Sequence, residues 1–330
     1  MGQPAALDFT GATAHPAGVT AAATGTRKAQ PYRRTTEHAM NSLTPLPCLD
    51  DATLAAERKR ELGLPRLVAA QLGTSAVAAI CDGGYTNAAG AWVDWRPQVA
   101  AAIAAKQSLP PAAPLRRAPP ITFTTTRVQV CNETTMGAAR RLMPAGGRPL
   151  ALNFANGVHP GGGFLHGARA QEEVLCRSSA LFATLDGDPM YAAHRARPQP
   201  DSSAWAIYSP DVPFFRSDDG TALAEPWLLS VLTCAAPVAQ VIGQPASGDL
   251  LAERIARALA IGHAFGHREL VLGAWGCGAF GNDPERTARD FKSALLDVFA
   301  GAFDQVVFAI ADWSEDRRVL EPFRRTFAAP

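Results

Sequence analysis

Three consecutive glycines, Gly161–Gly163, stand shortly before a pair of carboxylates, Glu172 and Glu173. They follow an apolar stretch, 149–154, with the character of a buried strand. Because glycine has no Cβ, the backbone can come close to a bulky anion and leave its amide groups free to donate. Acids just beyond such a loop can act as general acid and base on whatever the anion carries. The spacing therefore predicts an anion site with acid–base chemistry.

A second glycine loop, 273–282, also follows an expected strand and precedes an expected helix. In open α/β sheets, loops at the carboxyl ends of strands form the ligand crevice. Two such loops can hold one diphosphate from either side through backbone amides and helix N-termini. Residues 276–281 also read G-x-G-x-x-G, which keeps a dinucleotide-dependent dehydrogenase as an alternative. Its companion acid, expected about 20 residues later, is not in place, so we favour other nucleotide chemistry.

Glu172 and Glu173 are adjacent, so on a helix their side chains diverge by about 100°. Only one can point at a given atom, and the other orients it. A carboxyl beside a bound diphosphate feels like-charge repulsion, which raises its pKa and keeps it protonated as a general acid. As a carboxylate, the same group can then activate water against an oxocarbenium-like centre. The residues alone leave a structural alternative open, in which both acids only complement the positive end of a helix.

The glycine triplet, its short spacer and Gln171–Glu173 resemble the catalytic sequence of microbial-type poly(ADP-ribose) glycohydrolases. The resemblance covers roughly residues 50–330, and the family has a macrodomain core. It implies hydrolysis of ribose–ribose O-glycosidic bonds in poly(ADP-ribose) with release of ADP-ribose, and it requires no metal or cofactor. Glu173 would be the general acid and base, Glu172 would hold ribose hydroxyls, and Gln171 would support both acids.

The resemblance also implies a set of substrate contacts. Gly161, Gly162 and Gly163 would cradle the diphosphate through their amides. Gly276, Cys277, Gly278 and Ala279 would close over it from the opposite side, and Phe280 would pack on the distal ribose. Asn156 would lie against that ribose, and Glu133 would accept the exocyclic amine of adenine.

Two other activities need much of the same site. One is a hydrolase that removes single ADP-ribose groups from modified proteins or nucleic acids, and the other is a reader that binds ADP-ribose without turnover. The expected partners are therefore poly(ADP-ribose) or ADP-ribosylated proteins.

The net charge, the apolar runs and the cysteines of the chain argue against several other classes of protein. The net charge of +1 gives no reason to expect direct nucleic-acid binding, and no apolar run approaches the roughly 20 residues of a membrane helix. The six cysteines form no C-x-x-C pair, so a zinc site is unsupported. Cys277 has no histidine nearby in the sequence to activate it as a nucleophile. We expect free thiols and a cytoplasmic protein, or a nuclear one if the chain is eukaryotic.

The elements that must position these residues follow an α/β order, which predicts a mixed sheet with helices on both faces. Helices are expected near 51–62, 99–106, 134–143, 171–185, 248–265 and 284–300, with a closing helix after 310. Main strands are expected at 127–131, 149–154, 205–209, 227–234, 269–272 and 305–310.

Composition divides the chain into three parts. Residues 1–45 lack apolar periodicity, and we expect a disordered extension. Residues 46–115 form an accessory helical segment with a short hairpin between Tyr85 and Trp95. After a proline-rich connector, residues 116–330 form the macrodomain-like catalytic domain that the resemblance implies.

Overall fold

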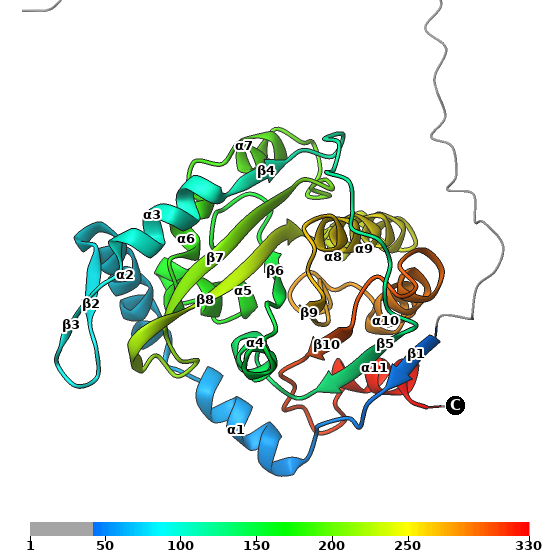
Figure 1. Ribbon diagram of the computed structural model, residues 1–330, viewed down its shortest axis with the longest axis horizontal. Helices are drawn as coiled ribbons and strands as arrows, with labels where there is room; N and C mark the ends of the chain where they lie inside the picture. The colour runs from blue at the N-terminus through cyan, green and yellow to red at the C-terminus, as the bar shows by residue number, and fades with distance from the viewer. Residues whose placement is uncertain (1–41, 330) are drawn as a thin grey trace, which may run out of the picture. The chain divides into compact units, whose positions relative to one another are not determined.

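The structure, a computed structural model, describes residues 42–329, and its central element is an eight-stranded mixed sheet (Figure 1). In spatial order the strands are β1 (Ser42–Pro45), β5 (Thr125–Cys131), β10 (Gln305–Ala309), β9 (Glu269–Leu272), β6 (Leu150–Ala155), β8 (Ala222–Ala235), β7 (Ala206–Arg216) and β4 (Gln107–Leu109). Neighbours from β1 to β8 are parallel, whereas β7 and β4 each pair antiparallel with the strand before them.

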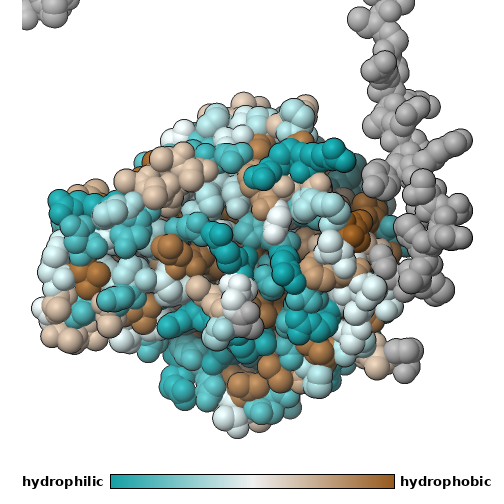
Figure 2. Space-filling view, in the orientation of Figure 1, coloured by the Kyte–Doolittle hydropathy of each residue, from teal (hydrophilic) through white to brown (hydrophobic). Residues whose placement is uncertain are grey.

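Helices cover both faces of this sheet, because the central strands are apolar on both sides. In β10, Val306 and Phe308 enter one core while Val307 and Ala309 enter the other, which is the period of two of a strand. The first core is covered by α9 (Ala246–Ala264), α10 (Pro284–Ser293) and α11 (Leu320–Phe327). The second is covered by α4 (Thr135–Leu142), α5 (Gln171–Ser178), α6 (Leu181–Leu185) and α7 (Pro189–Arg195). Figure 2 shows polar and apolar residues interspersed on the outer surface seen from this side.

The predicted α/β fold is confirmed, and each expected main strand is present. The largest difference is at β7 and β8, which continue beyond their predicted ends into a long hairpin. Their register shifts twice, between Ser209 and Val212 and between Phe214 and Arg216. These irregularities break the simple alternation on which the predicted ends were based.

Two predicted helices are shorter than expected. The helix predicted over 171–185 is divided into α5 and α6, because Ser179 adopts an extended backbone (φ −150°, ψ 179°) and forms a bridge with Phe214. The helix predicted over 284–300 is α-helical only through Ser293 and then widens into a π-turn, η3 (Ala294–Val298).

The N-terminal extension predicted over 1–45 lies mostly outside the described residues. Its last part does not match the expectation of disorder, because Ser42–Pro45 forms β1 and pairs in parallel with β5. The pairing is reinforced by a 2.7 Å hydrogen bond between the hydroxyls of Thr44 and Thr125.

The segment 46–115 contains the expected hairpin, formed by β2 (Gly84–Thr86) and β3 (Trp92–Asp94). It also contains α1 (Ala52–Leu62), α3 (Arg96–Ala105) and a helix that was not predicted, α2 (Arg66–Asp82). A small core joins this segment to the sheet, with Ala76, Tyr85 and Trp95 packed against Ala180 and Phe215. The remaining short helices are η1 (Met143–Ala145), η2 (Phe164–His166) and α8 (Ala239–Ile242).

Within 42–329, no single helix has the length and hydrophobicity needed to cross a membrane. The helices α1 and α2, which meet at 65°, reach that length and hydrophobicity only when the two are counted together.

Candidate active site

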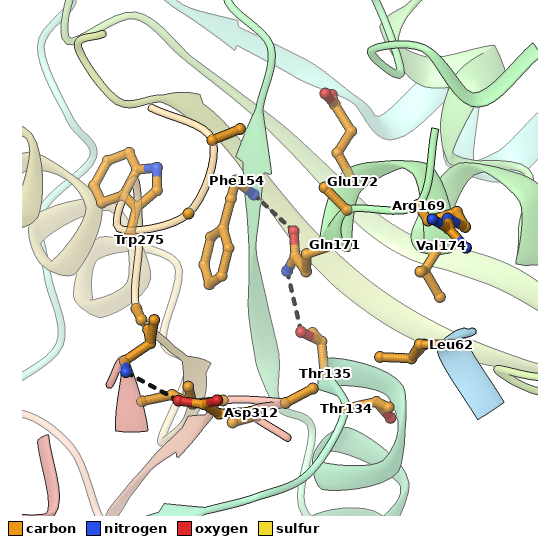
Figure 3. Close-up of a pocket in the computed structure, with 18 of the residues that line it drawn as sticks. Leu62, Thr134, Thr135, Phe154, Arg169, Gln171, Glu172, Val174, Trp275 and Asp312 are labelled. Atoms are coloured by element: carbon orange, nitrogen blue, oxygen red, sulfur yellow. Dashed lines mark hydrogen bonds between the residues drawn. The ribbon is translucent and has the colours of Figure 1, made fainter. Parts of the chain in front are cut away.

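A cavity of 590 Å³ lies where the parallel strands end (Figure 3). Because parallel strands present their carboxyl ends at one edge of the sheet, loops from distant parts of the chain meet there. The walls come from 133–136 after β5, 154–156 at the end of β6, 169–175 around the start of α5, 274–276 and 278–280 after β9, and 309–314 and 318–319 after β10. Both predicted acids and the second glycine loop therefore line one cavity, whereas Gly161–Gly163 are not among its lining residues.

Glu173 lines this cavity and is only 8% exposed. Its Oε1 accepts a 2.9 Å hydrogen bond from the amide of Gly163. Its Oε2 is buried and has no hydrogen-bond partner among the described residues. A carboxyl that is fixed through one oxygen and free at the other can exchange a proton with a bound molecule.

Glu172 also lines the cavity, and the protein holds both of its oxygens. Oε2 accepts from the Asn156 amide at 2.7 Å, and Oε1 accepts from the Asn153 side-chain amide at 3.3 Å. Burial raises the pKa of Glu172 to about 8; the hydrogen bond from Asn156 opposes this, and repulsion from Glu173 adds to it. Burial therefore favours the protonated form of Glu172 at higher pH than for an exposed carboxyl.

The amides of the glycine triplet are already in use, which corrects the expectation that they are free for a diphosphate. Gly163 donates to Glu173, Gly162 donates to the carbonyl of His159 at 3.0 Å, and Gly161 forms a hydrogen bond with Glu172. The positive φ angles of Gly161 (+69°) and Gly162 (+59°) turn the loop back toward α5. The triplet therefore holds the acids in place.

Gln171 is a structural link in this site. Its Oε1 accepts from the amide of Phe154 at 2.9 Å, and its Nε2 donates to the carbonyl of Leu152 at 2.7 Å and to Thr135 Oγ1 at 3.1 Å. Figure 3 shows this side chain bridging β6 and α4. With both ends of its amide engaged, Gln171 fixes the start of α5 relative to the sheet.

Asn156 combines loop capping with a position on the cavity wall. Its Oδ1 accepts from the amides of Val158 and His159 at 2.9 Å and 3.0 Å. This is an Asx-type turn, and it presents the Asn156 amide to Glu172.

The second glycine loop supplies the opposite wall through Gly276, Gly278, Ala279 and Phe280. A Cβ at Gly276, where φ is +76°, would lie 2.7 Å from the side-chain nitrogen of Asn282, so only glycine fits. Among the described residues, the amides of Gly278, Ala279 and Phe280 donate to no protein acceptor.

Cys277 belongs to the same loop but does not line the cavity. Its Sγ lies 3.5 Å from Thr287 Oγ1, and burial raises the pKa of its thiol to about 12. A thiol that stays protonated is a poor nucleophile, which agrees with the sequence-based expectation. Its predicted substrate contact has no support from the side chain.

Glu133 lines the cavity after β5, where an adenine contact was expected. Its carboxylate is ion-paired with Arg141 at 2.9 Å. Arg141 also donates a 3.0 Å hydrogen bond to Gln129 Oε1, so Glu133 is part of a fixed polar group on the cavity wall.

Sequence reasoning missed several cavity residues, among them Asp218, Trp275 and Asp312. Asp312 shapes one wall by accepting from the amides of Val319 at 2.9 Å and Leu320 at 3.1 Å. Burial disfavours the charged form of Asp312, but its hydrogen bonds from Ser314, Val319 and Leu320 outweigh this and lower its pKa. Its position just after β10 was an available signal, whereas Asp218 lies in a hairpin turn that gave none.

Fold and site together define a class: an α/β protein with a buried acid pair held by a glycine loop at the carboxyl ends of its strands. The family model of the microbial-type PARG catalytic domain matches residues 74–217. The chain also resembles a crystal structure of poly(ADP-ribose) glycohydrolase (PARG) from Thermomonospora curvata, with 41% identity and a TM-score of 0.74, over 78% of this chain and 99% of that one. This protein therefore belongs to the microbial-type poly(ADP-ribose) glycohydrolase family.

Other solved members are similar. The Thermomonospora curvata glycohydrolase bound to the inhibitor ADP-HPD shares 40% identity at a TM-score of 0.72, over 78% of this chain and 98% of that chain. The Deinococcus radiodurans glycohydrolase in complex with ADP-ribose shares 39% identity at a TM-score of 0.65, over 70% of this chain and 97% of that chain. No curated protein matches the chain.

Proposed function

We propose that this protein hydrolyses the ribose–ribose O-glycosidic bonds of poly(ADP-ribose) and releases ADP-ribose. Its solved relatives are poly(ADP-ribose) glycohydrolases, and one of them was solved in complex with ADP-ribose. The observation that carries the proposal is the Glu173 carboxyl, buried in the shared cavity with Oε2 unpartnered and Oε1 fixed by Gly163.

In the proposed mechanism Glu173 acts twice. The protonated carboxyl first donates its proton to the glycosidic oxygen, and the bond from that oxygen to the anomeric carbon breaks with the electron pair going to the oxygen. Water then adds to the resulting oxocarbenium-like carbon, and the Glu173 carboxylate takes the proton that the water loses. The acid is thereby restored, and no external reactant besides water is needed.

Glu172 supports this chemistry in its protonated form. Because burial raises its pKa to about 8, it does not add a second negative charge beside Glu173 near neutral pH. We assign Glu172, together with Asn156, to the binding of ribose hydroxyls.

The diphosphate is best accommodated by the second glycine loop. The amides of Gly278, Ala279 and Phe280 are free to donate, whereas those of Gly161–Gly163 are engaged with the acids and with His159. Consecutive amides of this kind form an anion-binding concavity. We therefore shift the main diphosphate contact to 278–280 and keep Phe280 as the group packed on the distal ribose.

The decisive experiment incubates the purified protein with poly(ADP-ribose) and separates ADP-ribose from oligomers. We expect wild type to release ADP-ribose and Glu173→Gln to lose about 10²- to 10⁴-fold in rate while it still binds ADP-ribose. Glu225→Gln, a change at an exposed site on β8, is the matched control and should keep full activity.

Other results of these assays would point to a different function for the protein or a different role for Glu173. Full activity in Glu173→Gln would refute the role of that residue. Binding of ADP-ribose with no release from any substrate would make the protein a reader, and release only from singly modified proteins would make it a mono-ADP-ribosyl hydrolase.

We also propose that the sheet is of the macrodomain type and that the protein works in the cytoplasm on poly(ADP-ribose) or ADP-ribosylated proteins. The location is supported by the cysteines, all six of which are free thiols, as is usual in a reducing compartment.

A further inference from the structure

A buried arginine lies one helical turn beyond Glu173 on the same side of α5. Arg177 is only 1% exposed, although its guanidinium carries a charge. Its Nε, Nη1 and Nη2 have no hydrogen-bond partner among the described residues. Burying an unmatched guanidinium is costly, and native proteins rarely retain one without a compensating role.

The groups around Arg177 are arranged by charge. Burial lowers the pKa of Arg177; attraction to Asp218 and Glu173 opposes this, and repulsion from Arg169 adds to it. Asp218, in the turn between β7 and β8, lines the same cavity as Glu173, and its Oδ1 is also buried without a partner in the described part of the chain. Arg177 therefore lies in an electrostatic group with two acids of the cavity and forms no direct ion pair with either.

Further charged groups from α1, α5 and β7 lie around Arg177 and Asp218. Burial is the main cause that raises the pKa of Asp218 to about 6. The hydrogen bond from Thr134 opposes this; from α1, Glu61 raises the pKa and Arg58 lowers it. Glu172 on α5 lies beside Glu173, and Arg216 at the end of β7 donates to the backbone carbonyl of Arg177 at 3.0 Å. None of these groups neutralises the guanidinium by direct contact.

We propose that Arg177 is a positioning residue for the catalytic acid: its buried positive charge stabilises the carboxylate that Glu173 becomes after it has given up its proton. In a low-dielectric interior a charge acts on a neighbour even without contact. The cost of burying Arg177 is then offset at the moment when Glu173 becomes negative.

This inference rests on the proposed function, so its test uses a readout that does not depend on turnover. The side-chain carboxyl of Glu173 is titrated by ¹³C nuclear magnetic resonance in the full chain, and its signal is identified by its loss in Glu173→Gln. We expect Arg177→Met to raise the titration midpoint by about 1 pH unit or more. Arg177→Lys, which keeps a positive charge, should stay near wild type. An unchanged midpoint in Arg177→Met would overturn the proposal.

Kinetics provide the second readout. The general acid must be protonated, so kcat/KM falls as the pH rises through its titration, and Arg177→Met should move this alkaline limb upward by the same amount. If Arg177→Met does not fold, Arg177→Gln decides: its neutral amide also removes the positive charge, so the midpoint should rise, and an unchanged midpoint would overturn the proposal.

Arg254→Met is the matched control. Arg254 is equally buried, at 2%, but it lies on α9 and donates to the carbonyls of Ala235 and Asp201. Its loss should reduce stability and leave the Glu173 midpoint unchanged. If Arg254→Met moves the midpoint as much as Arg177→Met does, the effect is general destabilisation and the proposal fails. If wild type does not release ADP-ribose, the proposed function fails, while the titration still decides the role of Arg177.

Discussion

Two neighbouring carboxyl groups meet very different surroundings at the start of α5. Glu172 accepts from Asn153 and from the amides of Asn156 and Gly161, whereas within 42–329 Glu173 accepts only from Gly163. The divergence of adjacent helical side chains explains how both environments exist side by side. Both oxygens of Glu172 are held by the protein, whereas one oxygen of Glu173 has no partner among the described residues.

At Glu172 the raised pKa has a consequence for stability. The pKa of Glu172 is about 8 in the folded protein and 4.5 for an unperturbed carboxyl, as in the unfolded chain. Between these two pH values the folded protein retains the proton that the unfolded chain has lost. The stabilisation is complete below the reference value and is lost as the pH rises toward 8. We expect Glu172→Gln to flatten the decline of the melting temperature between about pH 5 and 8.

Thermal unfolding measured across this range provides the check, with Glu253→Gln, at an exposed site on α9, as control. Equal slopes for wild type and Glu172→Gln would contradict the prediction.

At the residue scale, the sequence predicted which residues form the site but not which hydrogen bonds they make. Gly161–Gly163, Glu172 and Glu173 were identified from type and spacing. The direction of the glycine amides depends on φ angles of +69° and +59°, which glycine permits but does not require. A loop with the same residues in another conformation would leave those amides for a ligand.

The loop between β6 and α5 is the element that sets the acid geometry. At Gly162 an added Cβ would lie 2.4 Å from Glu173 Oε1 and 3.0 Å from Glu172 Oε2. We expect Gly162→Ala to displace both carboxyls and to reduce kcat about 100-fold.

Gly187→Ala separates this effect from backbone strain. Gly187 has a similar φ of +72°, but an added Cβ there meets no atom within 4 Å. Both variants should lose about 1–2 kcal/mol of stability from the left-handed backbone. Urea unfolding together with the polymer assay should show that only Gly162→Ala loses activity; equal activities would contradict the prediction.

The segment after β10 forms another wall of the cavity, and Asp312 holds its shape through the amides of Val319 and Leu320. Asp312→Asn replaces one acceptor oxygen by a donor, so we expect weaker ADP-ribose binding, measured by calorimetry. The lowered pKa of Asp312 also gives stability that is complete above about pH 5 and is lost as the pH falls. The variant should therefore lose less stability on acidification than wild type, and an unaltered acid profile would contradict this.

Elements with strong patterns were predicted, and elements without them were missed. Most of the central strands are apolar on both faces, so their sequences identify them. β1 and β4 contain four and three residues, which is too short for a periodic signal. α2 buries small residues, Ala69, Gly73, Ala76 and Ala79, and so lacks the stripe of large apolar residues that marks an amphipathic helix.

Across the whole molecule, the segment 46–115 is joined closely to the sheet. α2 lies so near η2 that a Cβ at Gly73 would be 2.5 Å from the carbonyl oxygen of Phe164. Arg216 reaches from β7 to the carbonyl of Leu72 and the hydroxyl of Ser75, both at 2.9 Å. Such ties depend on tertiary packing, which local sequence patterns do not report.

We expect these ties to make unfolding a single transition. Trp95 is fully buried, donates to the carbonyl of Ala79 at 3.0 Å, and packs edge-on against Phe215 of β7. Trp95→Ala should cost about 3–5 kcal/mol of global stability. Urea curves followed by circular dichroism and by fluorescence should coincide for wild type and variant. A separate early transition confined to one probe would show that 46–115 unfolds independently.

The two short outer strands have a consequence for solubility. A sheet of eight strands with long bare margins would offer a template on which other chains could add strands and aggregate. Here the margins are β1, four residues long with a proline at its end, and β4, with only three residues. Removal of β1 would expose the seven-residue β5, which carries Val128 and Val130, as the new rim. We therefore expect the small strand before the first helix to limit self-association of the protein.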